Sequence, residues 1–174
     1  MLVGSDDRRS RGFGLELDKR GEREIIDYAF CGYDGSGNLF INGQGSGNNM
    51  YLAELPKGAG GFINLKFAKY VNFLTMGQLQ WDGHYITLED YATHAIYRLV
   101  VSGFYAKVFG VTRLQRWKPP NLALSWIVGD RALVATGTRD AEINAWPYPH
   151  SGRATKIATA PASVFSIAYS AAHR

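Results

Sequence analysis

The stretch LQWDGHYITL, residues 79–88, predicts a β-hairpin, and its order of residues is the pattern on which the predicted fold of the whole chain rests. On each side of Asp82-Gly83, aromatic and β-branched residues alternate with polar ones, which is typical of a strand with one buried face. An Asp-Gly pair between two such runs favours a tight turn, because glycine accepts the positive φ that the turn requires. We therefore predict two antiparallel strands joined at Asp82-Gly83.

The order of this hairpin recurs on both sides of it. GYDGSGNLFI at residues 32–41 and WIVGDRALVA at residues 126–135 place Asp34 and Asp130 at intervals of 48 residues from Asp82. Each copy continues into a third and a fourth β-rich run. The third runs are residues 50–55, 95–101 and 142–146, and the fourth are residues 61–67, 106–114 and 154–159. This order predicts one four-stranded sheet per repeat of about 48 residues.

The repeats predict an all-β fold, because no segment longer than about ten residues has the 3.6-residue period of a helix. We expect residues 28–174 to form three four-stranded blades of a propeller-like fold, with Ala162 to Ser170 as the first strand of a fourth blade. Residues 1–27 form a charged N-terminal segment that we expect to supply at most one or two strands of an incomplete blade. A generic β-sandwich and a closed barrel are the alternative packings.

Three of the expected strands resemble those of a known superfamily. The second strands Leu39–Ile41 and Tyr85–Leu88, and the third strand Ile96–Leu99 with Ser102-Gly103 after it, resemble blades of NHL-like and SMP-30-like β-propellers. Uncharacterised bacterial members are the most similar, and the resemblance spans about residues 28–170. It implies a propeller fold. SMP-30-like enzymes hold a divalent metal on the axis with acidic and amide side chains, but that ligand pattern has no residue-by-residue match here, so lactonase activity is not carried over.

Three blades are fewer than the roughly four to eight that close a propeller. An open arc leaves apolar sheet faces that need a cover. The expected partners are therefore a second copy of this chain or the missing blades of a longer chain, of which this sequence would be a fragment. A degenerate fragment without independent activity is a third possibility.

Composition excludes several classes of protein. With 46% hydrophobic and 20% charged residues the chain is not disordered as a whole, and no apolar run approaches the roughly 18 residues of a membrane span. The net charge is +4, but the basic side chains are scattered singly, which argues against nucleic-acid binding.

The start MLVGSDDRRSR lacks a secretory signal, so we expect a cytoplasmic protein if this start is genuine and a secreted one if it is truncated. The single cysteine, Cys31, is expected to be a buried structural thiol.

The densest group of metal-ligating side chains surrounds the end of the central hairpin. If residues 84–90 form a strand, His84 and Asp90 share a face, Glu89 points the other way, and His94 lies across the following turn. The alternative is that Glu89 and Asp90 are turn residues and the histidines are partly exposed. We expect no cofactor, and a divalent ion such as Ca²⁺ or Zn²⁺ is the alternative.

Two loops between repeats carry side chains suited to binding. Residues 68–73 and 115–121 join a fourth strand to the next first strand, and in a propeller such loops share a face with the second-to-third-strand hairpins. The predicted ligand-binding residues on this face are Tyr70, Glu89, Asp90, Arg116 and Trp117. Alternatively, Tyr70 and Trp117 fold back and seal the gap between blades.

We predict a non-catalytic module that binds a small molecule or a protein on this face, and no catalytic residue is assigned. The alternative function is a metal-dependent hydrolase of the SMP-30 or lactonase type.

Overall fold

The computed structural model describes residues 25–45, 50–69, 71, 73–75, 77–90, 92–115, 125–136 and 141–160. These ranges contain strands and turns and no helix, so the predicted all-β class is confirmed. None of them contains a helix long and apolar enough to span a membrane. The strands are β1 (Ile25–Tyr33), β2 (Leu39–Gly45), β3 (Met50–Leu55), β4 (Ile63–Phe67), β5 (Leu79–Trp81), β6 (Ile86–Asp90), β7 (Ala95–Ser102), β8 (Tyr105–Gln115), β9 (Ser125–Val128), β10 (Arg131–Thr136), β11 (Ala141–Pro147), β12 (Gly152–Arg153) and β13 (Thr155–Ala160).

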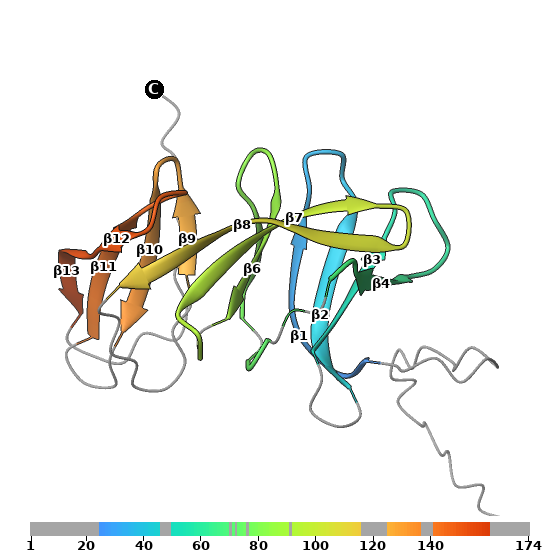
Figure 1. Cartoon of the computed structure of the whole chain (residues 1–174), viewed down its shortest axis with the longest axis horizontal. Coiled ribbons are helices and arrows are strands. Elements are labelled where there is room, and N and C mark those ends of the chain that lie inside the picture. Colours follow the sequence, from blue (N-terminus) through green and yellow to red (C-terminus); the bar gives the residue numbers. More distant parts are fainter. Residues whose placement is uncertain are drawn as a thin grey trace, which may run out of the picture.

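The strands form three antiparallel meanders, one for each sequence repeat. The first meander is β1 to β4, the second is β5 to β8, and the third is β9, β10, β11 and β13. Figure 1 shows them one after another along the long axis, with the third, in orange and red, at the left. The expected first strand of a fourth blade, Ala162 to Ser170, lies outside the described residues, as does most of the charged segment 1–27.

The first two meanders join into a nearly closed, barrel-like sheet. Its strand order is β1-β2-β3-β4-β8-β7-β6-β5, and β4 meets β8 through a short parallel pairing at Lys66 and Phe67. The two end strands of this order, β1 and β5, lie beside each other. A Cβ atom at Gly32 on β1 would come 2.8 Å from the carbonyl oxygen of Leu79 on β5. The backbones therefore approach so closely that only glycine fits at position 32.

Two hydrophobic cores separate the three meanders. The first lies within the barrel-like sheet and contains Phe40, Leu52, Leu88 and Leu99. The second lies between the second and third meanders and includes Ile96, Val134 and Trp146.

The second meander supplies side chains to both cores. Along β7, Leu99 faces the first core while Ile96 faces the second, and every residue of β6 is buried. Successive side chains of a strand point to opposite faces of its sheet. The second meander therefore packs against another meander on each of its faces, while the outer part of its β7–β8 hairpin stays exposed.

The turns at the three aspartates are not equivalent. Asp34 Oδ1 accepts hydrogen bonds from the amides of Ser36 and Asn38, and Asp82 Oδ1 does the same for His84 and Tyr85. The predicted glycine turn is confirmed at Gly83, whose φ is +102°.

In the third repeat the expectation of a matching aspartate is wrong. The positive φ falls at Gly129, before Asp130, in a two-residue turn, and the Asp130 side chain is 90% exposed. Glycine at the first central position suits a type II′ turn, which needs no aspartate side chain to hold it.

The expectation that Cys31 is buried is also wrong, because its side chain is exposed. Gly32 faces β5, so the neighbouring Cys31 points to the opposite side of β1. No other meander of the described chain covers that side.

Candidate functional site

The structure places two of the five predicted binding residues. Glu89 and Asp90 are the last residues of β6, and both are almost completely buried. Tyr70, Arg116 and Trp117 lie outside the described residues. The binding face predicted from these five residues therefore stays a prediction.

Asp90 organises the loops around the end of β6. Its Oδ1 accepts hydrogen bonds from the Thr75 hydroxyl at 2.7 Å and from the amides of Ala92 and Thr93, and its Oδ2 accepts one from the amide of Leu74. The loop between the first two meanders thus lies beside the β6–β7 turn, at the same end of the sheet. Both carboxylate oxygens are occupied in holding these loops.

Glu89 faces the third meander. Its Oε2 accepts hydrogen bonds from the Ser125 hydroxyl at 2.8 Å and the Ser125 amide at 3.2 Å, while the buried Oε1 has no hydrogen-bond partner. Burial raises the pKa of this carboxyl to about 7, and the bonds from Ser125 lower it only in part. Glu89 is a buried, titratable contact between the second and third meanders.

Two amide side chains make similar contacts between repeats. Gln80 on β5 binds the backbone of Ile127 twice, donating to its carbonyl at 2.8 Å and accepting from its amide at 3.0 Å. Asn42 on β2 is fully buried, donates to the carbonyl of Gly77 at 2.8 Å and accepts from the amide of Phe30. These bonds satisfy backbone groups where no strand ladder continues from one meander to the next.

The candidate metal ligands are dispersed along the second hairpin. His84 is exposed in the turn before β6, whereas Asp90 is buried at the far end of that strand. His94 lies in the β6–β7 turn with a φ of +53°. No group of three or more His, Cys, Asp or Glu side chains that could hold a metal ion occurs within the described ranges.

A different cluster, not anticipated from the sequence, surrounds Arg98 on β7. Arg98 pairs across the ladder with Gly110 on β8, and a Cβ at Gly110 would overlap Arg98 Nη2. The guanidinium carbon lies 5.8 Å from the ring centroid of Phe109, which stacks on Tyr85 with a centroid distance of 4.7 Å. Gly110 thus leaves room for the guanidinium, which also lies near the Phe109 ring.

The nearby carboxylate of Asp82 is already occupied. Its Oδ2 accepts a short hydrogen bond from the Tyr148 hydroxyl, and its Oδ1 accepts the amides of His84 and Tyr85. Burial, with the adjacent Asp82, raises the pKa of Tyr148 above its ordinary value, so the hydroxyl stays protonated and donates. This bond ties the turn after β11 to the β5–β6 turn.

The β7–β8 hairpin, which we call the β7–β8 ribbon, exposes several large apolar side chains. Val100, Phe104, Tyr105 and Phe109 are all exposed, with Phe104 at 63% and Phe109 at 59%. Val100 and Tyr105 lie on the same side of the ribbon as Arg98, beyond the part that the third meander covers. Exposed apolar side chains gathered in this way are typical of interaction surfaces.

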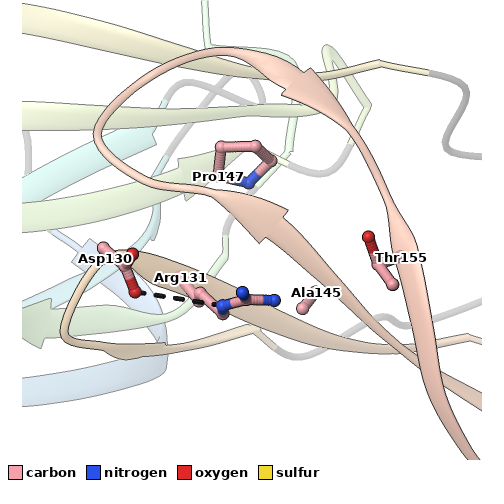
Figure 2. Close-up of a pocket in the computed structure, with 5 residues that line it drawn as sticks. All are labelled: Asp130, Arg131, Ala145, Pro147 and Thr155. Atoms are coloured by element: carbon pink, nitrogen blue, oxygen red, sulfur yellow. Dashed lines mark ion pairs between the residues drawn. The ribbon is translucent and has the colours of Figure 1, made fainter.

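The third meander has a shallow pocket of about 170 Å³ on its outer side. Figure 2 shows its lining of Asp130, Arg131, Ala145, Pro147 and Thr155, with Asp130 and Arg131 forming a 3.9 Å ion pair. Pockets for small organic ligands usually hold about 300–1,000 Å³. This pocket is too small for such a ligand.

Comparison with known proteins identifies no family for the chain. No family model matches the sequence, and a search of curated proteins finds no similar one. The resemblance to NHL-like and SMP-30-like propellers therefore stays a prediction.

Proposed function

We propose that the chain is a non-catalytic binding module built from three propeller-like blades, and that its first binding partner is a second copy of itself. One observation carries the proposal: among the described residues, the second meander packs against another meander on each of its faces, whereas no other described meander packs on the outer face of the first or of the third. The buried carboxylates support a non-catalytic role, because Glu89 and Asp90 bind backbone and hydroxyl groups of the neighbouring segments.

The arrangement of the first strands supports a propeller-like stack. β1 lies beside β5, and Gln80 on β5 binds Ile127 on β9. In a propeller the first strands of successive blades are neighbours around a central axis. The same neighbour relation occurs at both junctions of this chain.

The uncovered faces are apolar. On the third meander, Trp126, Leu133 and Ile143 are partly exposed, opposite to the side of Ala132 and Val134 that enters the second core. On the first meander, Leu39 and Leu55 are partly exposed, and Tyr33 on the same face is 62% exposed. A second copy would stack its first meander on the third meander of this one, and two copies would supply six blades, within the range that closes a propeller.

The test is the mass of the full chain in solution, measured by light scattering. We expect the wild-type chain to have twice its 19.2 kDa mass. Leu133→Glu places a charge on the uncovered face of the third meander and is expected to give a folded single chain. Val100→Glu, at an exposed position of the β7–β8 ribbon in the second meander, is the control and is expected to pair like the wild type. A wild-type chain that stays single at all concentrations would contradict the proposal, as would unchanged pairing in Leu133→Glu.

A further inference from the structure

Arg98 is a positioned cation that lacks an anion. Its Nε is buried and has no hydrogen-bond partner, and no described carboxylate forms an ion pair with it. The Asp82 carboxylate, which like Arg98 acts electrostatically on Tyr148, is occupied by the Tyr148 hydroxyl and by two backbone amides. A partly buried guanidinium without an acceptor is unfavourable, since buried charged groups are normally paired.

The surroundings of Arg98 hold it in one orientation. The guanidinium lies across Gly110, where any side chain would collide with it, and beside the Phe109 ring. Tyr85 stacks on the same ring with an interplanar angle of 16°. Because these neighbours restrict the side chain before any ligand arrives, binding would require less ordering of it than of a freely rotating arginine.

The Arg98 guanidinium and the apolar side chains near it indicate the chemical class of a ligand. A guanidinium fork matches the two oxygens of a carboxylate. Val100 is exposed on the Arg98 side of the ribbon, and the exposed Phe109 ring lies near the guanidinium. We propose that Arg98, Phe109 and Tyr85 form a binding site for an organic carboxylate that carries an apolar ring or chain. This site deepens the proposed binding function but lies within one chain, so it does not depend on pairing with a second copy.

The experiment is an NMR titration of the full chain with phenylacetate, following the Arg98 Nε–Hε signal and the Gly110 amide. We expect saturable shifts at both groups, and weaker binding of acetate, which lacks the ring. Arg98→Lys keeps the charge but loses the planar fork, and it is expected to weaken phenylacetate binding at least about tenfold. Arg113→Lys, an exposed cation on the opposite side of β8, is the matched control and is expected to bind as the wild type does.

A second variant separates the role of the ring from that of the charge. Phe109→Leu is expected to reduce the preference for phenylacetate over acetate while the acetate affinity changes little. Equal binding of inorganic phosphate and phenylacetate would overturn the assignment of the ligand class. Shifts at Arg98 that do not saturate, or an Arg98→Lys chain that binds as tightly as the wild type, would overturn the site itself.

Discussion

The Asp90→Ala chain is expected to lose about 3 kcal/mol of unfolding free energy, because a buried acceptor that serves several donors disappears. Asp90 is fully buried and binds the amides of Leu74 and Thr93 and the hydroxyl of Thr75. Alanine leaves these groups without their partner, and the loop between the first two meanders loses its attachment to the β6–β7 turn. The measurement is equilibrium denaturation in urea, in which the midpoint should fall while the slope stays constant.

Two variants control this measurement. Asp90→Asn keeps one acceptor oxygen and is expected to lose less stability than Asp90→Ala. Asp130→Ala removes a side chain that is 90% exposed, so its unfolding free energy should stay within about 0.5 kcal/mol of the wild type. If Asp90→Ala were as stable as Asp130→Ala, the assigned role of Asp90 would be wrong.

The Glu89→Gln chain is expected to be more stable than the wild type at alkaline pH and about equally stable at acidic pH. The folded-state pKa of Glu89 is about 7, above the ordinary value of 4.5. The folded chain therefore binds this proton more tightly than the unfolded chain, and wild-type stability falls as the pH rises from 4.5 to about 7. This difference between the two pKa values corresponds to about 3 kcal/mol of unfolding free energy. Glutamine is neutral at every pH, so the Glu89→Gln chain does not lose this stability.

Chemical denaturation at a series of pH values measures this effect. The wild-type and Glu89→Gln curves should diverge as the pH rises through about 7 and then run parallel. Glu142→Gln is the control, because exposed Glu142 forms a 2.8 Å ion pair with Lys156 that lowers its pKa, so no gain at alkaline pH is expected. Parallel wild-type and Glu89→Gln curves over the whole range would show that folding does not raise the pKa of Glu89.

The strands of each repeat could be predicted because local patterns determine them. The third run predicted at residues 50–55 is β3 (Met50–Leu55), and the hairpin predicted at Asp82-Gly83 has its positive φ at Gly83. Alternation of apolar residues and the backbone freedom of glycine both act over a few residues. The third turn differs because Gly129 precedes Asp130, and the spacing of the aspartates did not reveal that change of turn type.

The roles of Glu89 and Asp90 could not be predicted, because they depend on which meander covers each face. The two residues are adjacent, yet Asp90 binds the loop at Leu74 while Glu89 binds Ser125 on the third meander. Alternation along a strand predicts opposite faces, but not what lies against them.

The cluster at Arg98 could not be found from the sequence either. It requires the pairing of Arg98 with Gly110, and the ladder is irregular next to this pair, where Phe109 has no partner. A glycine within a long strand was the one available signal, since such a glycine often marks a close approach of another group.

The three meanders are stacked one on the next, and nuclear Overhauser contacts across their two junctions test this arrangement. The Gln80 side-chain amide lies within hydrogen-bond distance of Ile127, which is 47 positions away in the sequence, and the Asn42 amide lies equally near Gly77. In the full chain we predict cross-peaks from the Gln80 side-chain amide protons to the Ile127 amide, and from those of Asn42 to the residues around Gly77. If both sets were absent while the cross-peaks within each meander were present, the meanders would not be stacked, and the account would be contradicted.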